Sequence, residues 1–356
     1  MKSTHHYDNT VASKASLFLN RQRKECCKMN LSSLIADSIT EKARFGTSHA
    51  APNAISIGFG INARYARPMG VTITSIAANN PDVLLDFHVF VNSIDQIDVE
   101  RLEKLSEHFS SISITVYQVN DTFIAHLPTH NHLPLPTYFR FFMPLILKDN
   151  DKILYLDADI LCLNKISELI DLKMENYPAA VIADIAETAD KQVKALQLQT
   201  ELYFNAGVLL INVPEWLKQN ITEKALALLA DRSQRFLFLD QDALNIILHD
   251  RKMILPKKWN YISETDNNAT LPDDVVFLHC AARPKPWEIA CDKASPAHRL
   301  YAKYEKRSPW QGLPLMLPTM PTDARIYSER LFANGNILLG VTWYFRYLKL
   351  KYRKRK

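Results

Sequence analysis

The chain has 356 residues, 47% of them hydrophobic, which is enough to bury a sizeable core and predicts one large domain with a smaller appendage. Its formal net charge is +5, but seven lysines and arginines among the last eleven residues contribute +7, so the rest of the chain carries −2. This balance argues against an overall basic nucleic-acid-binding surface, and no nucleic-acid partner is expected.

The cysteines and the N-terminus indicate a reducing compartment. Five cysteines occur without a CxxC pair, and an odd count in a chain this long argues against a disulfide framework. They are Cys26, Cys27, Cys162, Cys280 and Cys291. The short apolar patch at residues 16–19 does not resemble a signal peptide, and no stretch has the length of a transmembrane helix. We therefore expect a cytoplasmic protein, with Met29 as a second candidate start.

Residues 1–52 are predicted to form a polar N-terminal extension with one helix from Leu31 to Arg44. Beyond it, strand-like runs alternate with segments of helical spacing. Strands are expected at residues 55–59, 84–91, 112–119, 152–156, 179–183 and 206–211, and helices at 69–77, 99–109 and 222–230. This alternation predicts an α/β fold, with a Rossmann-type, mostly parallel sheet flanked by helices on both faces.

After Leu255 the chain becomes richer in proline, tryptophan and tyrosine. This composition favours loops and short helices over regular strands. We expect this part to form a smaller cap that closes over the carboxyl edge of the sheet.

Two carboxylates directly follow the strand expected at residues 152–156. At a strand end, Asp157 and Asp159 can face one divalent cation while the residue between them points away. Such a cation would neutralise a departing diphosphate. However, a D-x-D triplet arises by chance about once in a chain of this length, and residues 149–151 and 240–242 repeat the spacing. The pattern alone leaves a metal site and a chance spacing both open.

Six blocks of sequence between Ile55 and Trp287 resemble glycosyltransferase family 8, the retaining hexosyltransferases that include the lipopolysaccharide core galactosyl- and glucosyltransferases. In chain order they are residues 57–65 (IGFGINARY), 137–140 (TYFR), 154–159 (LYLDAD), 203–212 (YFNAGVLLIN), 240–245 (DQDALN), and His279 with 285–287 (KPW). The resemblance implies a GT-A-like fold. It also implies a nucleotide-sugar-binding catalytic domain at 53–275 and a C-terminal cap at 276–335. Apart from the resemblance, the residues at 336–356 predict a basic, aromatic, membrane-associating tail.

The resemblance implies a metal and donor site. Asp157, Asp159 and His279 match metal ligands, which suit Mn²⁺ or Mg²⁺, and Lys285 matches a lysine that stabilises the departing diphosphate. Unaided, His279 would more often be a structural histidine and Lys285 a solvated loop residue. The UDP-sugar is expected to contact Gly60, Asn62, Arg64, Tyr65, Asp157, Ala158, Asp159, Asn205, His279, Ala282 and Lys285.

Four further residues match positions near the donor sugar and its anomeric carbon. They are Arg140, Asp184, Asp240 and Gln241. Amide and carboxylate groups suit a ligand that presents only hydroxyl groups, whereas Arg140, ahead of two phenylalanines, also fits a side chain that extends from a helix to solvent. The resemblance places Gln241 beneath the sugar. Because an amide is a poor nucleophile, we favour a same-face, ion-pair-like transition state over a covalent intermediate.

Three positions depart from the family pattern. Asn62 and Arg64 stand where the family usually has Asp and Asn, and Ala282 stands where a glycine is usual. Asn62 still offers hydrogen bonds to a base or ribose, Arg64 offers a phosphate contact, and Ala282 keeps the backbone further from phosphates. These changes favour either an altered donor preference or reduced activity.

The tail combines an apolar stretch that begins at Ile337 with the basic cluster from Arg346 onward. Aromatic and basic side chains suit a segment that lies in anionic headgroups, where each cation contributes about 1 kcal/mol. The apolar stretch is too short to span a bilayer. The alternatives are a solvated helix end and an RNA-binding arm.

These features predict a retaining, metal-dependent transferase that moves one hexose from UDP-galactose or UDP-glucose to a lipopolysaccharide core. The expected location is the cytoplasmic face of the bacterial inner membrane, with the membrane surface as a partner. The alternatives are a transferase with another polysaccharide or a protein as acceptor, and a catalytically impaired protein that binds a nucleotide sugar. The donor choice depends on pocket geometry, because the two sugars differ only in the orientation of one hydroxyl.

Overall fold

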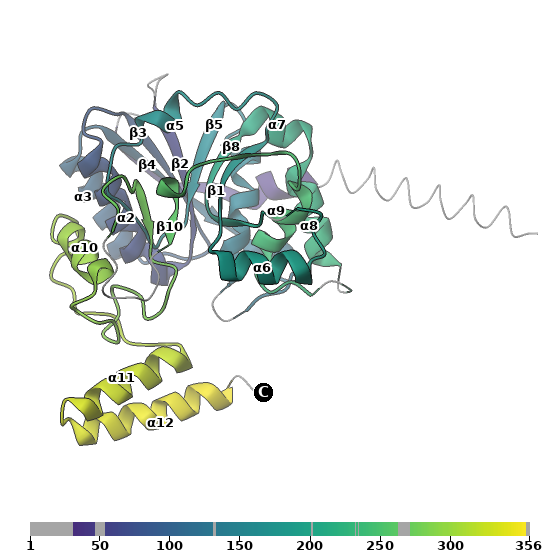
Figure 1. Cartoon of the computed structure of the whole chain (residues 1–356). Coiled ribbons are helices and arrows are strands. Elements are labelled where there is room, and N and C mark those ends of the chain that lie inside the picture. The colour runs from purple at the N-terminus through teal and green to yellow at the C-terminus, as the bar shows by residue number, and fades with distance from the viewer. Residues whose placement is uncertain are drawn as a thin grey trace, which may run out of the picture.

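The computed structural model describes residues 31–46, 54–130, 133–200, 202–231, 233, 235–262 and 271–353. Most of the expected N-terminal extension, with Met29, Cys26 and Cys27, lies outside the described residues, as do the last three residues of the tail. Figure 1 shows a central sheet with helices on both sides and a pair of C-terminal helices set apart from it.

The larger sheet has eight strands in the order β1-β4-β3-β2-β5-β8-β7-β9. They are β1 (Ile39–Gly46), β2 (Ile55–Ile61), β3 (Leu85–Val91), β4 (Ile112–Val119), β5 (Lys152–Leu156), β7 (Ala179–Ala183), β8 (Phe204–Asn212) and β9 (Lys252–Ile254). Strands β4, β3, β2 and β5 pair in parallel, as do β7 and β9, whereas β1 and β8 run antiparallel to their neighbours. The mostly parallel sheet is therefore confirmed, with one antiparallel strand at its edge and one inside it.

Helices cover both faces of this sheet (Figure 1). They are α2 (Ala66–Asn79), α3 (Gln96–His108), α4 (Met143–Ile146), α5 (Ser167–Ile170), α6 (Ala186–Ala195), α7 (Val213–Lys218), α8 (Ile221–Ala230) and α9 (Asp240–Ile247), with 3₁₀ helices η2 (Ala63–Tyr65), η3 (Asp121–Ile124), η4 (Leu135–Phe141) and η5 (Lys257–Trp259). Strand β5 separates two buried clusters, because alternate residues of a strand face opposite sides. Leu154 and Leu156 pack with α2 and α3, whereas Ile153 and Tyr155 pack with α8 and α9.

The helix expected from Leu31 to Arg44 is wrong over its second half. Residues 31–37 are helical, but Ile39 begins β1, which pairs antiparallel with β4. Ala43 and Phe45 alternate with exposed neighbours and are half-buried against the main core. An edge strand gains its hydrogen bonds from a distant partner strand, so local helical spacing was a poor guide here.

A second sheet of three short strands connects the cap to the D-x-D segment. Its order is β10 (Tyr261–Ile262), β11 (Phe277–His279) and β6 (Ile160–Cys162). These strands were not predicted from the sequence, because two or three residues are too few to show a period. The cap expected at 276–335 therefore begins with a strand rather than a loop.

The C-terminal part ends in a helical hairpin. Its helices follow α10 (Pro296–Glu305) and are α11 (Pro321–Ala333) and α12 (Ile337–Arg353). The rings of Tyr327 and Trp343 pack edge to face, with centroids 5.0 Å apart, and Arg283 ties the hairpin to the main body through Asp323 at 2.8 Å. Among the described residues, none of the helices is long and apolar enough to cross a bilayer.

Candidate active site

A cavity of about 270 Å³ lies where β2 and β5 end. Asn62 follows β2, and Asp157 follows β5. Because β8 runs antiparallel, its first residues, including Asn205, meet the same edge of the sheet. The reversed direction of β8 therefore brings residues 204–207 (FNAG) to the carboxyl ends of the neighbouring strands, where ligands of α/β sheets bind.

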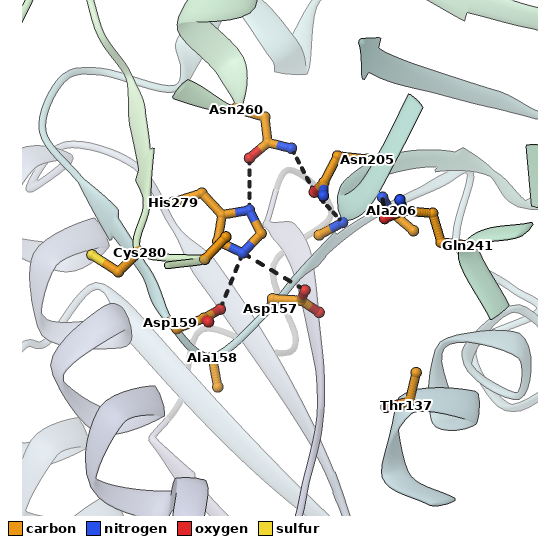
Figure 2. Close-up of polar contacts among 12 residues, drawn as sticks. Thr137, Asp157, Ala158, Asp159, Asn205, Ala206, Gln241, Asn260, His279 and Cys280 are labelled. Carbon is orange, nitrogen blue, oxygen red and sulfur yellow. Dashed lines mark hydrogen bonds and ion pairs between the residues drawn. The ribbon is translucent and has the colours of Figure 1, made fainter. Parts of the chain in front are cut away.

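The structure brings together the three expected metal ligands. One ligand atom from each of Asp157, Asp159 and His279 lies within 4.8 Å of the other two. His279 Nε2 is 3.3 Å from Asp159 Oδ1 and 3.9 Å from Asp157 Oδ2 (Figure 2). The antiparallel pairing of β11 with β6 sets His279 opposite Ile160, the residue after Asp159.

The chemistry of this cluster fits a hard divalent cation, because two carboxylates and an imidazole are suitable ligands for Mn²⁺ or Mg²⁺. Gly207 keeps the space between these groups open. A Cβ added there would lie 2.4 Å from Cε1 of His279 and 2.9 Å from Oδ2 of Asp157. The cluster therefore tolerates no side chain at position 207.

Lys285 belongs to the same cluster. Its Nζ donates to Oδ2 of Asp159 at 2.7 Å and to the carbonyl oxygens of Cys280 and Ala281. Burial alone would raise the pKa of Asp159, but the Lys285 ammonium and His279 outweigh it and hold that pKa well below its usual range. Burial lowers the pKa of Lys285, but Asp159 more than compensates and the pKa is raised. The two groups form a buried ion pair.

Arg140 connects the D-x-D carboxylates to the DQD block. Its Nε lies 3.0 Å from Oδ2 of Asp240, and its Nη2 donates to Oδ1 of Asp157 at 3.1 Å. The guanidinium is also 4.3 Å from the centre of the Tyr155 ring, and it donates to the carbonyl of Ala206. Arg140 is only 4% exposed, so the alternative of a side chain extending to solvent is wrong.

Asp240 is buried behind Arg140 rather than lining the cavity. Burial raises the pKa of its carboxyl group to about 7, against the opposing charge of Arg140. Leu239, just before it, has a φ of +46°, a conformation that costs energy in a non-glycine residue. The strained residue sets the start of α9, from which Asp240 and Gln241 project.

A second polar cluster lies beside the metal-ligand cluster. Gln241 Nε2 donates to Oδ2 of Asp184 at 2.9 Å and to the Tyr203 hydroxyl at 3.1 Å, while its Oε1 accepts from the backbone N–H of Ala206 at 2.9 Å. Asn205 Nδ2 also donates to Asp184, at 3.3 Å. The expected sugar-binding residues are thus joined in one hydrogen-bonded group, with Asn205 and Gln241 lining the cavity.

Not every residue of the expected nucleotide loop reaches the cavity. Gly60, Asn62 and Tyr65 line it, as does Ala158 between the two carboxylates. The guanidinium of Arg64 instead contacts Glu288 at 3.2 Å and the carbonyl oxygen of Leu317 at 3.1 Å, so the geometry does not support a phosphate contact. Ala282 is also outside the lining, which passes through its neighbours Ala281 and Arg283.

Some residues of the site were missed from the sequence. Tyr155 donates to Asp157 at 2.7 Å, Arg283 and Phe238 line the cavity, and Asn260 contacts His279. The sequence could have identified Tyr155, since it lies on the D-x-D strand two residues before Asp157. No sequence pattern pointed to Asn260, because only the pairing of β10 with β11 brings it to the site.

The sheet defines the fold as GT-A-like, a fold found in solved glycosyltransferases. The galactosyltransferase LgtC, solved with donor and acceptor sugar analogues, superposes with a TM-score of 0.62 at 23% identity, covering 73% of this chain and 98% of that one. The chain belongs to glycosyl transferase family 8, whose model matches residues 56–291. A second model, glycosyl transferase family 8 C-terminal, matches residues 296–351, a range that includes α10, α11 and most of α12.

The chain matches two relatives over more than nine-tenths of their length. The lipopolysaccharide 1,3-galactosyltransferase of Salmonella typhimurium is 34% identical over 319 residues, which are 85% of this chain and 93% of that protein. The lipopolysaccharide 1,2-glucosyltransferase of Escherichia coli K12 is 28% identical, over 85% of this chain and 92% of that protein. The family expected from the six sequence blocks is confirmed.

Proposed function

We propose that this chain is a retaining hexosyltransferase that moves galactose or glucose from a UDP-hexose to a lipopolysaccharide core, with a divalent cation. The names of the relatives support this acceptor and these two sugars. The observation that carries the proposal is that Asp157, Asp159, His279 and Lys285 converge in a cavity that Asn205 and Gln241 also line. One group suits a diphosphate and the other suits a sugar.

The first group would stabilise the leaving UDP. Asp157, Asp159 and His279 would hold the cation, which supplies positive charge to the diphosphate when bound. Lys285 would add a point charge, and its pairing with Asp159 keeps the ammonium fixed in the cavity wall. Arg140 holds Asp157 from behind, so the carboxylate does not need to reorganise during the reaction.

The second group would orient the hexose. Asn205, Gln241 and Asp184 offer amide and carboxylate groups to its hydroxyls. In the step that we favour, the bond from the anomeric carbon to the phosphate oxygen breaks, the acceptor hydroxyl forms the new bond on the same face, and its proton leaves with UDP. Gln241 suits this path because its amide bonds to Asp184, Tyr203 and Ala206 and is not activated as a nucleophile.

The base and ribose would lie against the loop after β2. Oδ1 of Asn62 accepts from the backbone N–H of Arg64 at 3.1 Å and so caps η2. An aspartate at this position would cap the same turn, so the substitution keeps the loop conformation and changes the hydrogen bonds offered to the nucleotide. We therefore attribute the Asn62 departure to donor contacts rather than to loss of the site.

We further propose that α12 lies on the cytoplasmic face of the inner membrane. Leu338, Val341, Phe345 and Tyr352 recur at helical spacing and are 87%, 41%, 64% and 58% exposed. The opposite face packs on α11 through Trp343. Arg346, Lys349 and Arg353 lie among or beside the exposed apolar residues in the sequence, which suits an interfacial helix in anionic lipid.

The proposal is tested by UDP release from UDP-galactose and UDP-glucose, with and without Mn²⁺, in the presence of truncated lipopolysaccharide. The wild-type protein should release UDP from one of the two sugars only with the cation, and Asp159→Ala should release none. Release that is independent of both the cation and Asp159 would contradict the assigned site. Binding of UDP-hexose without any release would favour a protein that only binds the nucleotide sugar.

A further inference from the structure

A buried asparagine outside the six sequence blocks lies between the two polar clusters of the cavity. Asn260 follows η5 and directly precedes β10, and it is 1% exposed. Its Oδ1 is 3.0 Å from Nδ1 of His279, and its Nδ2 is 2.9 Å from Oδ1 of Asn205 (Figure 2). Both polar atoms of its side chain therefore contact residues of the site.

The direction of each hydrogen bond follows from the neighbouring groups. The backbone N–H of Gly207 can only donate, and it contacts Oδ1 of Asn205 at 3.0 Å. That atom is therefore the carbonyl oxygen, and the amide nitrogen of Asn205 faces the Asp184 carboxylate. Asn260 must then direct its NH₂ group to Asn205 and its oxygen to His279.

This orientation fixes the tautomer of His279. Because an amide oxygen only accepts, Nδ1 of His279 must carry the proton. In the neutral ring, Nε2 then has a free lone pair, and it faces Asp157 and Asp159. A cation requires that form of the imidazole.

We propose that Asn260 is a positioning residue that holds His279 in the tautomer that binds the divalent cation and joins this ligand to the sugar-binding Asn205. This inference rests on the proposed function. It adds a residue whose contacts reach both the metal-ligand cluster and the sugar-binding cluster, so metal and sugar binding depend on one amide.

Main-chain hydrogen bonds hold the backbone near Asn260. Main-chain bonds already fix the segment, since the Asn260 N–H donates to the carbonyl of Lys257 and the Val276 N–H donates to that of Lys258. By contrast, Asn80, which is 2% exposed, bonds to the backbone of Ile166 and Ile76 and closes the end of α2. Asn80 is therefore the matched control for loss of a buried amide.

The first test measures Mn²⁺ affinity by electron paramagnetic resonance, without donor. Asn260→Leu, which has a similar volume and no polar atoms, should weaken Mn²⁺ binding by about 10- to 100-fold. Asn260→Asp keeps an acceptor for His279, so Mn²⁺ affinity should stay within about threefold of wild type. It cannot donate to Asn205, so the KM for UDP-hexose should rise by about tenfold. Asn80→Leu should lower Tm and leave Mn²⁺ affinity unchanged.

A second test needs no variant at the position. In metal-free wild-type protein, at a pH where the ¹⁵N shifts of His279 themselves report a neutral ring, those shifts should show the proton on Nδ1. Assignment would use His279→Gln. A neutral ring with its proton on Nε2, or a folded Asn260→Leu variant with wild-type Mn²⁺ affinity, would overturn the inference. If wild-type protein neither binds Mn²⁺ nor releases UDP, the proposed function itself fails.

Discussion

The active-site cavity and the C-terminal hairpin differ in which side chains they bury and which they expose. In the cavity, polar groups such as those of Arg140, His279 and Lys285 are at most 5% exposed, and each has a hydrogen-bonding or ion-pair partner. Among the described residues, the buried polar side-chain atoms without a partner all belong to residues outside the cavity lining. On α12, by contrast, the apolar Leu338 is 87% exposed.

From this difference we infer that the cavity serves catalysis and that α12 serves membrane binding. The cavity is preorganised, because its charges are already balanced and held by the fold before a ligand arrives. The exposed apolar side chains of α12 would gain free energy if another apolar phase covered them, which is the basis of the proposed membrane contact. Changes in the cavity should therefore affect catalysis and leave membrane binding unchanged, and changes on α12 should do the reverse.

The largest effect is expected for Lys285→Met. Loss of its charge from the diphosphate side of the cavity should lower kcat by about 100- to 1000-fold, measured by UDP release at saturating donor. Liposome binding should stay unchanged. Lys191→Met removes an exposed lysine that pairs with Glu187 on α6 and should retain activity within about twofold. Near-normal kcat for Lys285→Met would contradict the role of this charge.

Gly207→Ala should lower kcat/KM by about 100-fold, because displacement of a site group by about 1 Å has effects of this size. The added methyl would collide with His279 and Asp157, so Mn²⁺ affinity should fall with activity. The measurements are a Mn²⁺ titration and steady-state kinetics, with Tm as the control for folding. A variant that keeps wild-type Mn²⁺ affinity would show that the cluster does not need the open space at position 207.

On the other side of the comparison, the double variant Leu338→Ser and Phe345→Ser should weaken binding to anionic liposomes by about tenfold or more. Activity on a soluble acceptor fragment should remain within about twofold of wild type. Ile97→Ser with Ile254→Ser removes two exposed apolar side chains elsewhere, 56% and 46% exposed, and should bind liposomes normally. An equal loss of liposome binding in both double variants would contradict a specific role of α12 at the membrane.

The smallest effect concerns stability and pH. In the folded protein the pKa of Asp240 is about 7, against 3.8 for an ordinary aspartate, because burial disfavours its charge. The folded state therefore holds more protons between these values, and the free energy of unfolding falls as pH rises through this window. Between about pH 5 and 8, the Tm of wild type should fall by several degrees relative to Asp240→Asn. A constant difference in Tm would contradict the raised pKa.

The sequence was informative where a local pattern and the final structure coincide. Strands β4, β5 and β7 have the predicted bounds, because β4 largely alternates apolar and polar residues and β5 and β7 are mainly apolar runs. The D-x-D pair and His279 were placed by their resemblance to family motifs, and the structure brings them together. The roles of these residues remain predictions that the experiments above address.

What the sequence did not predict depends on contacts between distant segments. Strand β1 gains its partner from β4, and β11 gains its partner from β6 across the D-x-D turn. Asn260 reaches His279 only through this small sheet, and Arg64 turns away because Glu288 and the carbonyl of Leu317 compete for its guanidinium. None of these pairings has a local period or spacing that a single sequence reveals.

The most direct test of the central claim is the structure of the product. Truncated lipopolysaccharide, UDP-galactose or UDP-glucose, Mn²⁺ and the wild-type protein should be incubated together, and the purified product analysed by mass spectrometry and by NMR of the new anomeric proton. We predict the gain of one hexose in an α linkage, which retains the configuration of the donor. A β linkage, or no added hexose from either donor, would contradict the account.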